Sequence, residues 1–224
     1  MLVFRADAST HMRVVMAASM AGSDEARRIS RAEALAVSSR EETLARHYRC
    51  VCSFARGFEV HGGQGLEEFN VIMPWFVQNA QVHFLSPHGL EQYSGAAWGT
   101  RDVCQGPFEL ALAFGHDDIA RSIVLKVFAH QNTDGSLPQW FMFDEYAYLY
   151  QKDSHGDIPV WPLMAIGEYL DASGDESILD EYVGFWDRDT DRPCDGESTV
   201  LDHLERTISY IRSHRVPGTR LFSY

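Results

Sequence analysis

The chain has 224 residues and a mass of 25.3 kDa, which suffices for one large domain or two small ones with a hydrophobic core. Hydrophobic residues make up 45% and aromatic residues 12% of it, which excludes an intrinsically disordered protein, and no apolar run reaches the length of about twenty residues that a membrane-spanning helix needs. The net charge of −13 argues against a protein that coats nucleic acid or an anionic membrane.

The first fifty residues differ in composition from the rest of the chain. Residues 1–50 are rich in Ala, Ser, Arg and Glu and hold almost no aromatic residues, so we expect a peripheral N-terminal arm. Acidic and basic residues alternate over 26–47, which favours one exposed helix stabilised by side-chain pairs. The apolar run 14–21 follows Arg5 and Asp7, and this late position argues against a secretion signal.

The cysteine pattern gives no sign of a metal site. Cysteines occur at positions 50, 52, 104 and 194, without the paired C-x-x-C units that bind zinc. We therefore expect reduced thiols in a cytoplasmic protein, with no metal and no cofactor. Together with the net charge, this leaves neither nucleic acid nor a membrane among the expected partners.

Aromatic residues become frequent from about Phe54 onward, and the hydrophobic periodicity there predicts helices. Alternation typical of strands is scarce, and the charged run 187–195 is expected to be an exposed loop. The sequence therefore predicts an all-α fold of paired helices, arranged as a toroid whose loops line a central pocket. The expected helices cover residues 66–85, 108–114, 119–130, 159–170, 176–183 and 198–214.

Three of these helices have apolar stripes at helical spacing, and the stripe of helix 119–130 consists of Ile119, Ile123, Val127 and His130. The last helix is expected to begin with Ser198 as its N-cap and to point one stripe inward. The other two stripes are Leu66, Phe69, Ile72, Phe76, Ala80 and Phe84 on the first helix, and Leu201, Leu204, Ile208 and Ile211 on the last.

Two loop clusters mix aromatic, carboxylate and amide side chains between predicted helices. They cover residues 87–107 and residues 137–141 with 155–163. Aromatic faces pack against sugar rings, while Arg, Asp and Gln side chains bind pairs of hydroxyl groups, so this composition favours a carbohydrate ligand. The motifs of nucleotide-binding proteins, serine hydrolases and zinc proteases do not occur in the sequence.

Four separated blocks in these clusters resemble the inverting phosphorylases of glycoside hydrolase family 94, which have an (α/α)6 barrel. The similarity covers about residues 57 to 185 and is greatest to the branch that acts on β-1,2-linked glucooligosaccharides. Cellobiose phosphorylases have Asp after the glutamine of the second block, whereas Gly106 follows Gln105 here, which puts cellobiose in doubt as the substrate. The blocks are Gly-Leu-Glu-Gln-Tyr-Ser-Gly (89–95), Trp-Gly-Thr-Arg-Asp-Val-Cys-Gln-Gly-Pro (98–107), Leu-Pro-Gln-Trp-Phe-Met-Phe (137–143), and His-Gly-Asp (155–157) with Val-Trp-Pro-Leu (160–163).

The resemblance implies roles for particular residues. Asp157 matches the family's general acid, and Arg101 and Asp102 match the pair that holds the non-reducing glucosyl unit. Inorganic phosphate is the implied co-substrate and the glucooligosaccharide the implied substrate, with α-glucose 1-phosphate as product. The further residues expected to bind substrate are Trp98, Gln105, Gln139, Trp140 and His155.

A single catalytic carboxylate fits this chemistry. An inverting hydrolase needs a second carboxylate to activate water, whereas phosphate is already an anionic nucleophile and leaves only the leaving group to be protonated. The helix expected after Asp157 would lower the pKa of that carboxyl, while burial among Trp140, Phe141 and Trp161 would raise it, and the sequence leaves this open. Without the family blocks, Asp157 would be interpreted as an N-cap. Trp161 lies at helical spacing with Leu163 and Ile166, so we expect it to pack in the core.

Two other functions remain open at this stage. The first is an inverting hydrolase on the same barrel, with Glu91, Asp144 or Glu145 as the base. The second is an inactive fragment that only binds carbohydrate or assembles with other chains. The predicted helices are about half the number that a closed double ring needs, so residues 51–224 are expected to be the N-terminal portion of an incomplete catalytic domain, for which a homodimer is one candidate state.

Overall fold

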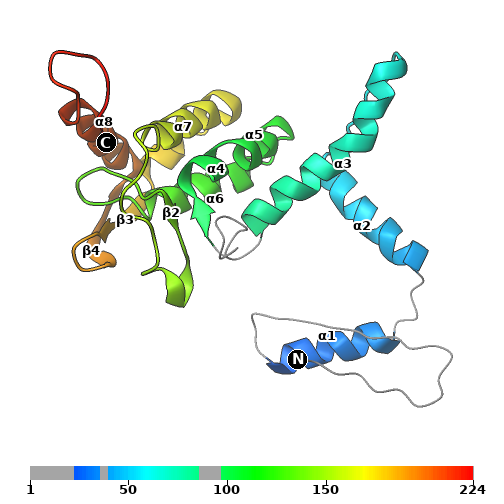
Figure 1. The fold of residues 1–224 in the computed structure, drawn as a ribbon. Coiled ribbons are helices and arrows are strands. Elements are labelled where there is room, and N and C mark those ends of the chain that lie inside the picture. The colour runs from blue at the N-terminus through cyan, green and yellow to red at the C-terminus, as the bar shows by residue number, and fades with distance from the viewer. Residues whose placement is uncertain (1–22, 36–39, 86–96, 224) are drawn as a thin grey trace. The chain divides into compact units, whose positions relative to one another are not determined.

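The structure is a computed structural model that describes residues 23–35, 40–85 and 97–223 (Figure 1). The chain divides into two compact units, residues 1–50 and residues 51–224. The first unit contains α1 (Ser23–Leu35) and most of α2 (Arg40–Phe54). The helix predicted over 26–47 is thus helical over 26–35 and 40–47, and its residues 36–39 lie outside the described residues. The apolar run 14–21 lies outside the described residues.

The second unit is mostly helical, which confirms the helical class predicted from the sequence. The described residues do not form a closed barrel, and the barrel therefore stays a proposal. Gly174, with a φ of +67°, ends α7 in the left-handed conformation that glycine adopts easily. The helices are α3 (Gln64–Leu85), α4 (Thr100–Cys104), α5 (Gly106–Ala113), α6 (Asp117–Phe128), α7 (Val160–Ser173) and α8 (Val200–Ser213), with 3₁₀ turns η1 (Asp144–Tyr146) and η2 (Glu176–Asp180).

An antiparallel hairpin occupies a region where the sequence predicted a helix and a loop. Strands β3 (Tyr182–Asp187) and β4 (Arg192–Thr199) pair, with Tyr182 opposite Thr199. The helix predicted over 176–183 is therefore confirmed only as the 3₁₀ turn η2, and the loop predicted over 187–195 only as the turn 188–191. Aromatic and β-branched residues in β3 favour a strand, and its residues Val183 and Phe185 are buried. The carboxylate of Asp187 accepts hydrogen bonds from Thr190, which stabilises the turn between the strands.

The core lies where α4, α5, α6 and α7 pack together. Ile123 and Val127 on α6 are almost completely buried, as their helical spacing predicts. The end of α2 joins this core, because Phe54 stacks on His116 with ring centroids 4.2 Å apart and its carbonyl oxygen lies 2.7 Å from His116 Nε2. Other fully buried side chains of the core are Val103, Phe108, Ala111, Phe128, Ala165 and Tyr169.

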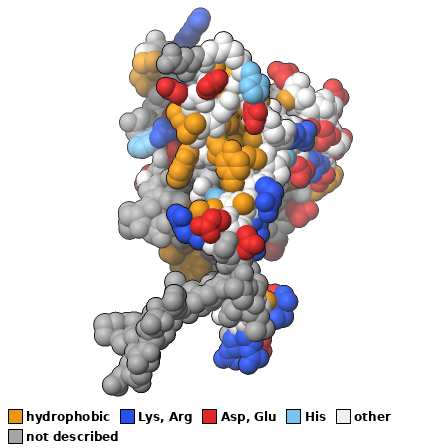
Figure 2. Space-filling model, turned by 90° about the vertical axis from the view of Figure 1, so that its right-hand side faces the viewer, with side chains coloured by type: hydrophobic (Ala, Val, Ile, Leu, Met, Phe, Trp, Pro, Cys, Tyr) orange, Lys and Arg blue, Asp and Glu red, His pale blue; other side chains and the backbone are white. Residues whose placement is uncertain are grey.

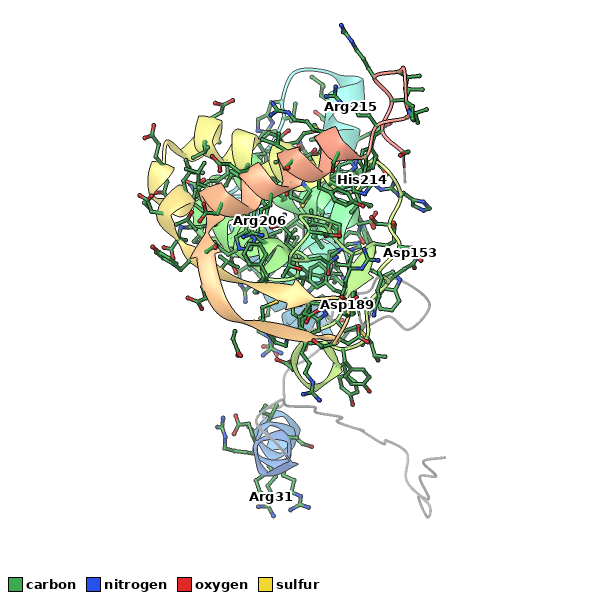
Figure 3. All side chains as sticks on the ribbon, turned by 90° about the vertical axis from the view of Figure 1, so that its left-hand side faces the viewer. Arg31, Asp153, Asp189, Arg206, His214 and Arg215 are labelled. Atoms are coloured by element: carbon green, nitrogen blue, oxygen red, sulfur yellow. The ribbon has the colours of Figure 1, made fainter. Side chains whose placement is uncertain are left out.

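Helix α8 buries its predicted stripe only in part, because Leu204 packs against the core. Leu201 and Ile208 are exposed, whereas His203 and Thr207 are fully buried. The helix begins after Thr199, whose side chain forms a capping box with Asp202, instead of after Ser198. The two buried polar side chains are satisfied by Gln131: its Oε1 lies 2.5 Å from His203 Nδ1, and its Nε2 donates to Thr207 Oγ1 over 2.6 Å. Figure 3 shows α8 with the labelled Arg206 beside the hairpin, and the Arg206 guanidinium lies over the Phe185 ring at 4.6 Å.

Helix α3 leaves most of its predicted stripe in solvent. Leu66, Phe69, Ile72 and Phe76 are exposed, and burial begins only at the C-terminal end of the helix, at Val77, Ala80 and Phe84. Figure 2 shows hydrophobic side chains gathered on one face of the molecule. No helix among the described residues is long and apolar enough to cross a membrane.

Candidate active site

A short ladder brings together two of the sequence blocks. Strand β1 (Trp98–Gly99) pairs with β2 (Trp140–Phe141), so Trp98 lies opposite Phe141. The ladder continues at Thr100, whose N–H donates to the carbonyl oxygen of Gln139 over 3.0 Å. The buried Thr100 hydroxyl also donates to the carbonyl oxygen of Pro138 over 2.6 Å. These bonds fix the start of α4, where Arg101 and Asp102 lie, against the segment 137–141.

Gln139 connects this ladder to the loop that contains Asp157. Its side-chain Oε1 accepts the N–H of His155 over 3.0 Å, and its own N–H donates to the carbonyl oxygen of Gln151 over 2.9 Å. The side chain is only 9% exposed, so these bonds are shielded from competing water. The residue that the sequence assigned to substrate therefore holds the loop 151–157 at two points.

The side chains of Arg101 and Asp157 meet where these segments converge. Arg101 Nη1 donates to Asp157 Oδ2 over 3.1 Å, and Trp161 Nε1 donates to the same oxygen over 3.1 Å. The side chain of Arg101 is 36% exposed and that of Asp157 is 46% exposed, so a ligand from solvent can reach both. The structure thus brings the expected acid and one expected sugar-binding residue into direct contact.

The pKa of Asp157 lies below its ordinary value. The indole hydrogen bond from Trp161 contributes most to this lowering, and the hydrogen bond and charge of Arg101 add to it, while partial burial acts in the opposite direction. Asp157 is not the N-cap of α7, because Pro159 occupies that position without a side-chain cap. The hydrogen bonds from Trp161 and Arg101 thus outweigh the effect of partial burial on the pKa of Asp157.

Asp102 and Gln105 line a separate cavity. Its volume is about 630 Å³, and the described residues around it come from α3, from α4 and α5, and from Gln105 between them, and do not include Arg101 or Asp157. A Cβ atom at Gly99 would lie 2.1 Å from Asp102 Oδ2, so only glycine permits the carboxylate to lie this close to the chain. Among the other lining residues are Phe69, Met73, Phe76 and His83.

The tryptophans that the sequence assigned to substrate differ in environment. Trp98 is 2% exposed and packs edge-on against Phe143 at 5.0 Å, with Lys126 Nζ 5.4 Å from its ring. Its Nε1 finds no hydrogen-bond acceptor among the described residues. Trp140 is half-buried and donates from Nε1 to Gln151 Oε1 over 2.9 Å.

Trp161, which the sequence placed in the core, also contacts the carboxylate of Asp157. Trp161 packs partly against the core, as predicted, but its indole nitrogen also binds Asp157. The spacing of four residues was the available signal, because it places the two side chains one helical turn apart.

Of the three alternative bases of a hydrolase, only Asp144 has a described side chain. Asp144 is exposed with a φ of +54° at the start of η1, while Glu91 and the side chain of Glu145 lie outside the described residues. Over the described residues, no cluster of three His, Cys, Asp or Glu side chains is arranged to hold a metal ion.

Comparison with known proteins agrees with the sequence blocks. No family model matches the chain. Over 165 residues the chain is 48% identical to the 1,2-beta-oligoglucan phosphorylase of Listeria innocua serovar 6a (strain ATCC BAA-680 / CLIP 11262), which covers 73% of this chain. The chain spans 15% of the length of that protein. The resemblance drawn from the sequence is thereby confirmed: most of this chain is similar to a segment of a 1,2-beta-oligoglucan phosphorylase.

Proposed function

We propose that this chain contributes the general-acid part of an active site that phosphorolyses β-1,2-linked glucooligosaccharides. The observation that carries the proposal is the convergence of Arg101 and Trp161 on the carboxylate of Asp157, in a segment similar to an oligoglucan phosphorylase. The chain corresponds to a small part of that relative, so its activity, its substrates and its partners are all parts of the proposal.

In the proposed reaction, Asp157 donates a proton to the oxygen that leaves the anomeric carbon. Inorganic phosphate forms the new bond to that carbon from the opposite face, which inverts the β-glucoside to α-glucose 1-phosphate. The leaving oligosaccharide keeps the proton as a hydroxyl group, and Asp157 takes a proton from solvent before the next turnover. No second carboxylate is needed, because the nucleophile is already an anion.

The other expected residues would hold the substrate. Arg101 has a guanidinium group at the exposed edge of the pair, where it can bind sugar hydroxyls or phosphate oxygens. Asp102, which lines the separate cavity, would bind the non-reducing glucosyl unit from that side. The remaining residues of this proposal are Trp98, Gln105, Gln139, Trp140 and His155.

The wider setting is also part of the proposal. The helices of residues 51–224 would form part of an (α/α)6 barrel, completed by further helices of the same enzyme or of a second copy. All four cysteines are free thiols, the state typical of a cytoplasmic protein, and we keep that location in the proposal.

Product analysis tests this function directly. The purified chain is incubated with β-1,2-glucooligosaccharides in phosphate buffer and in phosphate-free buffer, and α-glucose 1-phosphate is followed by ³¹P NMR. Phosphate-dependent formation of that product, abolished by Asp157→Asn and kept by Asp153→Asn, supports the proposal. Asp153 is a suitable control because its side chain is fully exposed.

Two other outcomes would contradict the proposed reaction. Release of reducing sugar in phosphate-free buffer would identify a hydrolase, and Asp144→Asn would then test its base. Sugar binding without turnover in either buffer would favour a carbohydrate-binding module, a candidate that the 15% coverage of the relative keeps open.

A further inference from the structure

Asp157 and Trp161 lie on either side of the start of α7. The carbonyl oxygen of Asp157 accepts the N–H of Val160 over 3.0 Å, and that of Ile158 accepts the N–H of Trp161 over 3.3 Å. This turn fixes the backbone between the two residues, and Ile158 within it is fully buried. The Trp161 ring is therefore held by the backbone below it and by the core beside it, rather than by Asp157 alone.

The two donors on Asp157 act on the same atom. Arg101 Nη1 and Trp161 Nε1 both lie 3.1 Å from Oδ2. An oxygen that accepts two hydrogen bonds is a poor site for a proton, because the proton would displace a donor. The other carboxylate oxygen, Oδ1, is then the better site for the proton.

The two donors differ in how firmly they are held. Arg101 is a charged, 36% exposed side chain, and an anionic or hydroxyl-rich ligand can draw it away from the carboxylate. The indole N–H is uncharged and belongs to a half-buried ring that packs against the core. We therefore expect the Trp161 bond to remain when a ligand binds Arg101.

We propose that Trp161 is a positioning residue for the acid: its indole N–H fixes Oδ2 of Asp157, so that the proton resides on Oδ1 and is presented to the leaving oxygen. This inference rests on the proposed function, in which Asp157 is the general acid. The same bond strengthens as Asp157 becomes a carboxylate, and it therefore favours the transfer of the proton to the leaving group.

Replacement of the indole by a phenyl ring separates this role from packing. Trp161→Phe keeps an aromatic ring against the core and removes the donor. We expect the pKa of Asp157, followed by ¹³C NMR of the aspartate carboxyl groups in the 224-residue chain, to rise by roughly one unit, which is about a tenfold change in its proton affinity.

A matched control comes from the same helix. The pKa of Asp175 is lowered most by the hydrogen bond from Ser177 and further by that from Tyr169, whose Oη donates to Asp175 Oδ2 over 2.7 Å. Tyr169→Phe should raise the pKa of Asp175 and leave that of Asp157 unchanged. An unchanged Asp157 pKa in Trp161→Phe, with the Asp175 shift present in the control, would overturn the inference.

A second measurement avoids any change to Trp161. The indole proton resonance of Trp161 in the wild-type chain should shift with the midpoint of Asp157 and should lose this titration in Asp157→Asn. An indole resonance that ignores Asp157 would overturn the inference. Both NMR readouts need no substrate, so they can fail while phosphorolysis succeeds, or succeed while phosphorolysis fails.

If phosphorolysis occurs, the high-pH limb of its rate profile should move to higher pH in Trp161→Phe. A limb that stays at the wild-type pH would refute the role of Trp161 in catalysis.

Discussion

Arg101 Nη1 and Asp157 Oδ2 lie 3.1 Å apart although the two residues are fifty-six positions apart in the chain. The contact joins the start of α4 to the loop before α7. It depends on the hydrogen bonds of Thr100 and Gln139, which align the two segments. Two of the sequence blocks therefore meet at one carboxylate.

Removal of the Arg101 charge should raise the pKa of Asp157. Arg101→Gln loses the ion pair, whereas Arg101→Lys keeps the positive charge and should shift the pKa less. The pair is half-exposed, so the loss of folding stability should stay below about 1 kcal/mol. Because the folded-state pKa is depressed, this contribution is present at neutral pH and is lost as the pH falls through that pKa. Carboxyl ¹³C titration and urea unfolding measure both effects, and an unshifted pKa in Arg101→Gln would refute the pair.

His130 should make the fold sensitive to acid. Burial lowers the pKa of His130 to about 4, because its ring lies stacked on Phe141 at a centroid distance of 3.9 Å. The folded state therefore favours the neutral imidazole. The contribution of His130 to stability is complete above about pH 6.5, its pKa in the unfolded chain, and is lost as the pH drops toward 4. Urea unfolding from pH 7 to pH 4 should show a smaller loss in His130→Phe than in the wild type.

An exposed histidine provides the control for this pH dependence. His61 has a side chain that is 78% exposed and lies 3.4 Å from Glu59. His61→Gln should leave the slope of stability against pH nearly unchanged. A slope that follows His61 instead of His130 would contradict the prediction.

Gly135 should tolerate no side chain. Its φ is +90°, and a Cβ atom there would lie 2.3 Å from the carbonyl oxygen of Arg206. Gly135→Ala should cost about 3 kcal/mol or more of folding free energy, because backbone atoms of α8 would have to move. Gly174→Ala, with a φ of +67° and no atom within 4 Å of the added Cβ, should cost only about 1 kcal/mol. Equal losses in urea unfolding would show that the contact with α8 contributes nothing.

Gln139→Ala should loosen the loop 151–157, which contains Asp157, at His155. The His155 amide loses its acceptor, and its hydrogen exchange should become at least about tenfold faster. The Thr100 amide donates to the backbone oxygen of Gln139, which the substitution keeps, so its exchange should stay close to the wild-type rate. Equal acceleration at both amides would indicate general unfolding instead of a local effect.

Local pattern predicted the helices well where burial follows helical spacing, as at Ile123 and Val127. It failed in part at α8, because the buried His203 and Thr207 form hydrogen bonds to a residue seventy-two or more positions away, which no local pattern reveals. It failed at the β3–β4 hairpin for a related reason, since strand pairing depends on a partner segment.

The candidate site shows the same limit. The sequence blocks identified Arg101 and Asp157, and the structure places them in contact. The blocks could not show that Arg101 and its neighbour Asp102 face different surroundings, because that depends on the packing of α3 near α4 and α5. They also assigned Gln139 to substrate, whereas its side-chain oxygen binds the backbone of His155.

The exposed face of α3 has a spectroscopic consequence. Trp75 on this helix is 70% exposed, whereas Trp98 and Trp186 are buried and the other two tryptophans are half-buried. Acrylamide should therefore quench the fluorescence of Trp75 before that of the other four. Any molecule that covers α3 would slow this quenching, and the intrinsic fluorescence of the chain can report the event without an attached dye.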